Sequence, residues 1–376
     1  MSSRGSFSKQ LRWYSNSATR KAGRGFFGWL QLPASVGIGC LAVLQLWRIR
    51  KRKKRDEPGD RPDWESPKSW QMSGFELLPT RMLSHYWGRI HHKELPRWLR
   101  SPVVGLYVKV FGCDMSEAEN EQLSDYKNIC ELFTRRLKPG TREVDQNCEF
   151  VVPCDGRVLY CGEVVDGQME QVKGVNYSLE KFVGHNLPVQ NSLIDNLRSD
   201  ASPNNYDKWY QDKKLYHVII YLSPGNCHHF YSPVSWTIDH RRHFHGHLIT
   251  VASWAAKRMK GLLSENERVL YSGQWHHGFF SLTAVGAYNV GSVEVSIEND
   301  LETNLRSDST LLGQYTTKQL TEKLVLNKGD HIGVFNLGSS IVLIFEAPDR
   351  FTFKVQPGDK VTFGQSLGVQ KVDVVP

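Results

Sequence analysis

The chain has 376 residues, enough for one large domain or two ordinary ones, and its formal net charge is +8. All of this excess lies at the N-terminus, because residues 1–55 hold 13 of the 47 Lys and Arg and none of the 39 Asp and Glu. The remaining body is mildly acidic, which argues against a nucleic-acid-binding protein. The seven cysteines include no Cys-x-x-Cys pair, so we expect scattered structural thiols rather than a disulfide framework or a zinc ribbon.

The first 69 residues carry the signals of targeting and anchoring. Residues 1–25 are rich in Ser and Arg and lack acidic residues, as in a mitochondrial transit peptide. Residues 26–47 are 22 residues without a charge, and a bilayer core needs about 20 apolar residues, so we expect a transmembrane helix. Residues 48–69 form a basic and then polar linker, whose start suits either anionic head groups or a stop-transfer flank. Both flanks of the span are basic, so charge alone does not orient it.

Residues 70–376 are predicted to form one folded domain. From about Trp70 to Leu137, apolar residues recur at helical spacings of three and four. The aromatic residues Trp98 and Tyr107 in this part suit either a bilayer surface or a core. After Pro139 and Gly140 the period changes to two, with short strands expected at 150–152, 157–163, 216–222, 278–285, 292–297, 332–336, 341–345 and 360–363. The fold class is therefore α+β, a helical segment followed by a mostly antiparallel β-sandwich or barrel-like domain.

A Gly338-Ser339 step stands before the apolar run 341–345. A serine in a tight turn can attack the carbonyl of the preceding residue, and glycine there leaves the approach open and permits a strained backbone. The ester can leave by elimination, and the new N-terminus hydrolyses to a pyruvoyl group. Its carbonyl can form a Schiff base with a substrate amine and accept the electrons of a departing carboxylate. Gly-Ser steps are also common in ordinary hairpin turns, so the pair alone does not decide.

Six segments supply the context for this step. They are FTRRLKPG at 133–140, VPCDG at 152–156, VKG with YSL at 172–179, NERV at 266–269, VGA with VGS at 285–292, and FNLGSS at 335–340 followed by EAP at 346–348. In this order they resemble the motifs of the phosphatidylserine decarboxylase family, in its mitochondrial proenzyme form. The resemblance covers about 132–368, and Ser340 is a mild departure, because the family form is Leu-Gly-Ser-Thr.

The resemblance implies a division of labour. The chain would cleave itself between Gly338 and Ser339, and Ser339 would become the pyruvoyl cofactor. Asp155 matches the carboxylate of an Asp-His-Ser relay that activates the serine, and His228 matches the first family histidine, which acts in decarboxylation. The product would be phosphatidylethanolamine and CO2, and the two chains would stay associated; homo-oligomers are left open.

The histidine segment departs from the family pattern. The family shows Asp-Tyr-His-x-x-His-x-Pro where this chain reads NCHHFYSP, so Asn226, Cys227 and Tyr231 replace an acid, a tyrosine and the relay histidine. A tyrosine, with an ordinary pKa near 10, is a poor general base at neutral pH. Either Tyr231 is activated, or His229 substitutes, or the chain is a catalytically impaired lipid-binding relative of the same fold. A serine hydrolase is a further alternative, which the absence of a Gly-x-Ser-x-Gly elbow disfavours.

Two histidine groups invite a metal interpretation. In HRRHFHGH, at 240–247, His243, His245 and His247 would share one face of a strand and could bind zinc. Gly246 and the flanking arginines disfavour a closed site, so we expect partly exposed strand histidines and no metal. His276 and His277 are expected to be a loop pair without function.

The resemblance and the N-terminus together imply a location. We expect a single-pass protein of the inner mitochondrial membrane with its catalytic domain facing the intermembrane space. Its partners would be phosphatidylserine and anionic membrane lipids, with no nucleic acid.

Overall fold

The computed structural model describes residues 93–172, 174–185, 213–251, 253–256, 259–287, 293–298, 300–303, 311–336 and 338–370. The predicted transit peptide, transmembrane helix and linker lie outside these residues. Within the described part, no helix is both long enough and apolar enough to cross a bilayer.

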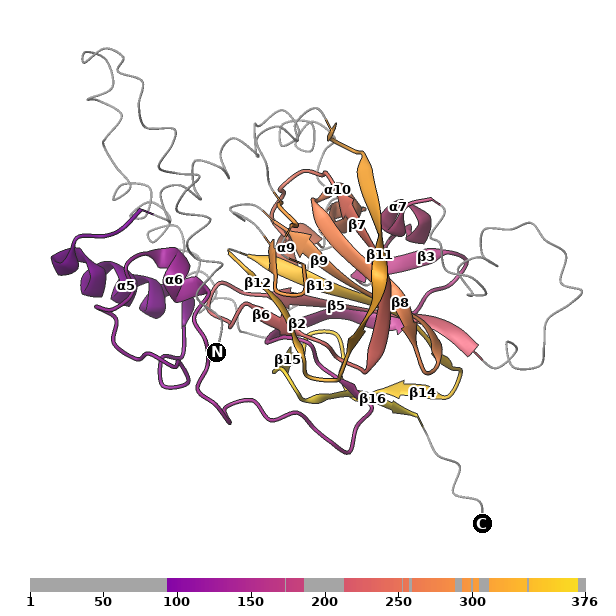
Figure 1. Cartoon of the computed structure of the whole chain (residues 1–376), viewed down its shortest axis with the longest axis horizontal. Coiled ribbons are helices and arrows are strands. Elements are labelled where there is room, and N and C mark those ends of the chain that lie inside the picture. Colours follow the sequence, from indigo (N-terminus) through magenta and orange to yellow (C-terminus); the bar gives the residue numbers. More distant parts are fainter. Residues whose placement is uncertain are drawn as a thin grey trace, which may run out of the picture. The chain divides into compact units, whose positions relative to one another are not determined.

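A large antiparallel sheet organises the domain (Figure 1). Its strands, in spatial order, are β11 (Tyr315–Leu326), β7 (Trp236–Phe244), β8 (Arg268–Trp275), β9 (Gly278–Gly286), β13 (Ser339–Pro348), β5 (Lys213–Leu222), β2 (Gly156–Glu163) and β15 (Lys360–Val361). Every neighbouring pair is antiparallel, which confirms the predicted sheet type. β13 lies inside the sheet, between β5 and β9.

Three smaller antiparallel sheets complete the β structure. They are β1 (Phe150–Val151), β16 (Ser366–Gln370) and β14 (Phe351–Phe353); β10 (Val293–Val295), β12 (His331–Phe335) and β6 (His229–Tyr231); and β3 (Gln168–Val172) with β4 (Val175–Ser178). Ile341, Leu343 and Phe345 of β13 share one core with Phe150 of β1 and Phe335 of β12. The first two small sheets therefore cover one face of the large sheet.

Short helices cover the other face. These are α7 (Leu179–Val183), α9 (Ser253–Ala256) and α10 (Leu262–Glu265), and they pack with Val342 and Ile344 in a second core. Because both faces of β13 are buried, its sequence is a near-continuous apolar run instead of an alternating one.

Two helices precede the sheets, α5 (Arg97–Phe111) and α6 (Ile129–Phe133). Pro96 stands at the N-cap of α5, and Gly112 ends the helix in the left-handed conformation at φ 67°. α6 begins at Asn128, whose side chain accepts a hydrogen bond from the backbone N–H of Glu131 at 2.9 Å. The prediction of helices before the β domain is confirmed for these residues.

The prediction for the cysteines holds in the described residues, whereas the prediction for the histidines of β7 does not. The six cysteines of the described part are all free, and five of them are buried, as structural thiols should be. The expectation of partly exposed strand histidines is wrong, because His240, His243 and His245 are buried. β7 pairs with β8 on one side and β11 on the other, so it is not an edge strand. It also ends at Phe244, so His245 and His247 lie beyond it.

Candidate active site

Ser339 is the first residue of β13 and is fully buried. Its backbone lies between Leu222 at the end of β5 and Gly286 at the end of β9. Among the described residues, its hydroxyl oxygen has no hydrogen-bond partner, and neither does that of Ser340. A buried hydroxyl without a partner costs free energy, and this one lies at the bond where cleavage is predicted.

His228 lies at the same end of the sheet. The loop that carries His228 directly follows Leu222, the partner of Ser339 in β5. The backbone carbonyl of His228 accepts a hydrogen bond at 3.1 Å from the N–H of Phe335, in the segment that leads to Ser339. The imidazole packs on Phe133 with ring centroids 3.7 Å apart, and its Nδ1 donates to the carbonyl of Asn226 at 3.0 Å. Nδ1 therefore carries the proton, and Nε2 offers a lone pair.

The second nitrogen of His228 offers an unpartnered lone pair in the described part of the chain. Nε2 is buried and has no partner among the described residues. Burial lowers the pKa of His228 from 6.5 to about 3, because the charged imidazolium is disfavoured away from water. The ring is thus neutral at physiological pH, with Nε2 unprotonated.

The two replaced residues before His228 have structural contacts. The side-chain oxygen of Asn226 accepts the backbone N–H of Ser223 at 2.9 Å and so closes the loop after β5. The thiol of Cys227 points to the carbonyl of Arg135 at 3.9 Å, and burial raises its pKa to about 11. Neither side chain supplies a base at neutral pH.

Tyr231 is packed as an aromatic side chain. Its ring stacks on Phe363 with centroids 3.8 Å apart and an interplanar angle of 14°. Burial raises its pKa to about 12, because the phenolate would lose its hydration. Activation of this tyrosine as the base is therefore opposed by its environment.

His229 is the first residue of β6, directly after the loop that carries His228. Its Nε2 donates to the carbonyl of Thr134 at 3.0 Å, so its Nδ1 accepts a hydrogen bond from Nε2 of His331 at 2.9 Å. Both ring nitrogens are thus occupied by structural hydrogen bonds.

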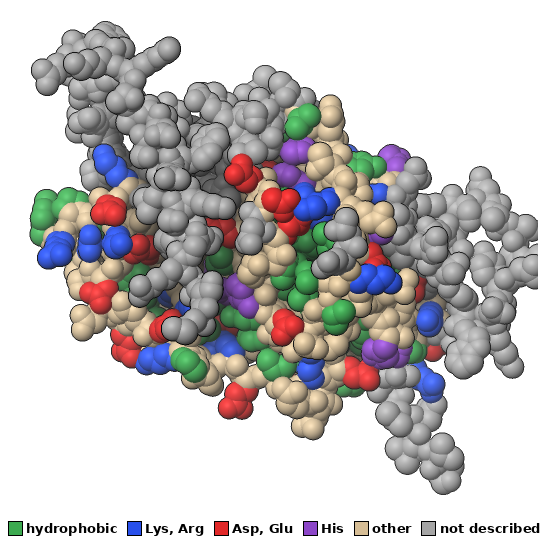
Figure 2. All heavy atoms as spheres, in the orientation of Figure 1, with side chains coloured by type: hydrophobic (Ala, Val, Ile, Leu, Met, Phe, Trp, Pro, Cys, Tyr) green, Lys and Arg blue, Asp and Glu red, His purple; other side chains and the backbone are tan. Residues whose placement is uncertain are grey.

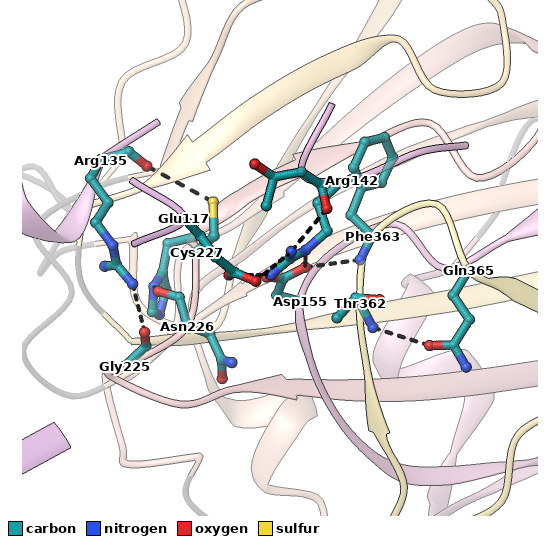
Figure 3. Close-up of polar contacts among 12 residues, drawn as sticks. Glu117, Arg135, Arg142, Asp155, Gly225, Asn226, Cys227, Thr362, Phe363 and Gln365 are labelled. Carbon is teal, nitrogen blue, oxygen red and sulfur yellow. Dashed lines mark hydrogen bonds and ion pairs between the residues drawn. The ribbon is translucent and has the colours of Figure 1, made fainter. Parts of the chain in front are cut away.

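Asp155 is the anchor of an ion-pair network (Figure 3). Its carboxylate accepts from Nε and Nη2 of Arg142, the latter at 2.8 Å, and from the backbone N–H of Phe363 at 2.9 Å. Arg142 also binds Glu117 through Nη1 at 3.0 Å and Nη2 at 2.7 Å. Because Phe363 lies C-terminal to the predicted cleavage bond, this network joins the two segments that cleavage would separate.

The partners of Asp155 carry no recognisable signal in the sequence. Arg142 comes two residues after the FTRRLKPG motif and carries no spacing signal of its own. Phe363 contributes through its backbone, so its residue type says nothing. In the described residues the carboxylate faces a guanidinium and an amide, and its contacts include no imidazole.

Replacing Arg142 with methionine is expected to destabilise the fold. Methionine keeps most of the stem but leaves the buried carboxylate of Asp155 without its charge partner, at a cost of about 3 kcal/mol in the free energy of unfolding. Lys181→Met, which breaks the exposed pair with Glu265, should change that free energy by no more than about 0.5 kcal/mol. Chemical denaturation measures both; equal small effects would show that the network is not stabilising.

The serine at the start of a buried strand and the neutral histidine at the same end of the sheet suit one class of protein, the self-processing pyruvoyl proenzymes. Comparison with known proteins gives the particular family. The profile of the family described as "Phosphatidylserine decarboxylase" matches residues 129–369, more than half of the chain. The chain belongs to this family and is a pyruvoyl-dependent decarboxylase proenzyme, with the cofactor derived from one of its own serines.

Individual relatives agree with the family match. The chain is 44% identical over 325 residues to "Phosphatidylserine decarboxylase proenzyme, mitochondrial" of Cricetulus griseus, covering 84% of this chain and 79% of the relative. It is 45% identical over 304 residues to the protein of the same description from Pongo abelii, covering 80% and 74%. For "Phosphatidylserine decarboxylase proenzyme 1, mitochondrial" of Schizosaccharomyces pombe the identity is 36% over 393 residues, covering 89% and 90%.

Proposed function

We propose that the chain cleaves itself between Gly338 and Ser339 and then decarboxylates phosphatidylserine to phosphatidylethanolamine, with Ser339 as the source of the pyruvoyl group. The observation that carries this assignment is the pair of buried atoms without partners at one end of β13, Oγ of Ser339 and Nε2 of His228. Neither atom has a hydrogen-bond partner among the described residues, so each is free to react.

We assign the base of self-cleavage to His228. Its neutral Nε2 would take the hydroxyl proton of Ser339 while Oγ attacks the carbonyl carbon of Gly338, forming an ester as the Gly338–Ser339 amide bond breaks. Removal of the Ser339 α-proton then expels the carboxylate of Gly338, and the dehydroalanine left behind takes up one water and releases ammonia to become pyruvoyl. Tyr231 and His229 are less suited, because the first resists ionisation and both ring nitrogens of the second are bonded.

The residues present fit the cofactor and its chemistry. The pyruvoyl carbonyl supplies an electron sink for loss of CO2. Nε2 of His228 would relay a proton to the carbon losing the carboxylate, and the packing of the ring on Phe133 fixes its orientation. Burial of Ser339 keeps bulk water from the reacting atoms. We propose that Asp155 is a positioning residue, which acts through Arg142 and the backbone of Phe363.

Cleavage would leave chains of 338 and 376 − 338 = 38 residues. We expect them to remain associated, because the small chain contributes β13, which pairs along its length with β5 and also with β9. It also supplies β14, β15 and β16, and its Phe363 N–H bonds Asp155 of the large chain.

A carbonyl reagent separates this function from its alternatives. Hydroxylamine should abolish release of CO2 from phosphatidylserine vesicles, whereas a fluorophosphonate that labels serine hydrolases should leave it unchanged. The opposite pattern would support a serine hydrolase, and a folded chain that binds the vesicles without releasing CO2 would support the lipid-binding relative.

The pH dependence of stability reports on His228. Its folded-state pKa of about 3 lies below the ordinary 6.5, so between these values the unfolded chain binds a proton that the folded chain does not. The contribution of His228 to the free energy of unfolding is fully present above pH 6.5. It is lost as the pH falls, by up to about 1.4 kcal/mol per pH unit. In the uncleaved Ser339→Ala chain, adding His228→Asn should flatten the fall of the unfolding free energy between pH 7 and 5. Parallel pH profiles for the two chains would contradict a buried neutral imidazole.

We also propose that the protein acts in the inner mitochondrial membrane, anchored by residues 26–47, with its catalytic domain in the intermembrane space. The relatives' names include the word mitochondrial. Trp98 is 77% exposed on α5, beside basic residues. Figure 2 shows hydrophobic side chains (green) and Lys and Arg side chains (blue) together at that end of the molecule. A helix that lies in the membrane interface requires both kinds of side chain. In a chain without residues 1–69, flotation with anionic vesicles should weaken in Trp98→Ala; unchanged flotation would show that α5 does not contribute to membrane binding.

A further inference from the structure

Three potential ligands meet at the end of the large sheet that is opposite to Ser339. His276 and His277 form the turn between β8 and β9, and Glu149 lies immediately before β1. One ligand atom from each of the three lies within 4.8 Å of the others. Nε2 of His276 is 3.4 Å and Nε2 of His277 is 3.8 Å from Oε2 of Glu149.

This cluster is separate from the cleavage site. β9 begins at Gly278 beside the turn and ends at Gly286 beside Ser339. Eight residue steps at about 3.3 Å each put the two ends of the strand roughly 26 Å apart. A ligand at Glu149, His276 and His277 would therefore not touch the reacting atoms.

The spacing of the three atoms suits a tetrahedral metal ion. Ligand atoms about 2.0 Å from a zinc ion lie about 3.3 Å from one another, close to the two histidine–glutamate distances. Two imidazoles and a carboxylate are the donor types that zinc and similar divalent transition metals take. Glu149 and His276 are exposed, so an ion could enter without opening the fold, and the fourth position would face water.

Neighbouring contacts hold both sides of the cluster in place. The ring of Trp275 lies edge-on to both imidazoles, at 4.7 and 4.8 Å, and its Nε1 donates to the carbonyl of Glu346 at 3.0 Å. On the other side, the thiol of Cys148 bonds the carbonyls of Phe150 and Gly368, which fixes the backbone next to Glu149 against β16. The ligands are thus carried by two anchored backbones.

We propose that Glu149, His276 and His277 form a binding site for one divalent transition metal ion of the zinc type. The ion would tie the β8–β9 turn to the segment before β1, whose Phe150 pairs with Gly368 of the small chain. Its role would be structural, reinforcing the association of the two chains.

The test uses the tag-free, self-cleaved protein after dialysis against a chelator. Zinc is titrated into it, and isothermal titration calorimetry measures the binding. We expect one saturable site, weakened by about tenfold or more in each of Glu149→Gln, His276→Ala and His277→Ala, since even an indirect contact to a metal ligand is worth that much. His185→Ala is the matched control, because exposed His185 pairs with Glu180 and no third ligand joins them among the residues that the structure describes. It should bind zinc as the unsubstituted protein does.

A second readout concerns stability. Zinc should raise the midpoint of thermal unfolding of the unsubstituted protein and of His185→Ala, but not of the three ligand variants. The proposal is overturned if the protein shows no saturable zinc binding. It is also overturned if the three substitutions leave the affinity unchanged.

Discussion

Ser339→Ala is expected to yield a single uncleaved chain with no decarboxylase activity. Alanine has no hydroxyl to attack the carbonyl of Gly338, and no other side chain can take its place, because the attack must come from the residue whose amide bond breaks. The loss of activity should be complete, since without cleavage there is no pyruvoyl group. Gel electrophoresis and a CO2-release assay with phosphatidylserine vesicles measure the two effects.

The same substitution should not harm the fold. The hydroxyl of Ser339 is buried without a partner, so replacing it by a methyl group removes an unmet polar group and leaves stability unchanged or slightly higher. Ser340→Ala is the matched control: its hydroxyl is equally buried and equally without a partner, yet it should cleave normally. Cleavage of the Ser339→Ala chain, or its loss in Ser340→Ala alone, would reassign the reacting serine.

His228→Asn is expected to slow self-cleavage by about 10²- to 10⁴-fold, the range for loss of a general base. The asparagine side-chain nitrogen stands where Nδ1 stands in histidine, so it can keep the hydrogen bond to the carbonyl of Asn226 while Nε2 is removed. A time course of cleavage after cell-free synthesis measures the rate. Chains that do cleave should also decarboxylate slowly, because we assign the relay of a proton to the product to the same nitrogen.

Tyr231→Phe separates this account from the family relay. The ring would keep its stacking on Phe363, and only the hydroxyl would be lost, so the cleavage rate should stay within about threefold of the unsubstituted chain. The reverse result, with Tyr231→Phe uncleaved and His228→Asn cleaved, would show that the tyrosine is the base despite its raised pKa. Loss of cleavage in both variants would mean that the two residues act together.

The sequence predicted the strands whose apolar residues are contiguous. The run 341–345 lies in β13 and is buried on both faces. Its apolar pattern therefore predicts a buried strand whatever packs against either face. β7 is absent from the strands predicted by period, and only its histidines suggested a strand, because Arg241 and Arg242 interrupt its apolar pattern. These charges are accommodated by tertiary contacts, such as the ion pair of Arg241 with Glu298 at 3.0 Å, which no local pattern reveals. β11 was also not predicted as a strand, because polar residues such as Lys318 and Gln319 give its sequence the composition of a loop.

The candidate site divides in the same way. Ser339 and His228 could be named in advance because motif order fixes them, and the structure brings them to one end of the sheet. The partners of Asp155 could not be, because the Arg142 and Phe363 contacts depend on the folded chain. Likewise, the sequence leaves open whether Tyr231 is activated; its burial, which raises the pKa, is a property of the packed structure.

The central claim is that Ser339 becomes the pyruvoyl group of a 38-residue chain, and an intact-mass spectrum of the purified, denatured protein tests it most directly. We predict a fragment that ends at Pro376 and whose mass matches Ser339–Pro376 with pyruvoyl in place of the N-terminal serine. A single uncleaved mass from protein shown to be folded, or a fragment that retains an N-terminal serine, would contradict the account.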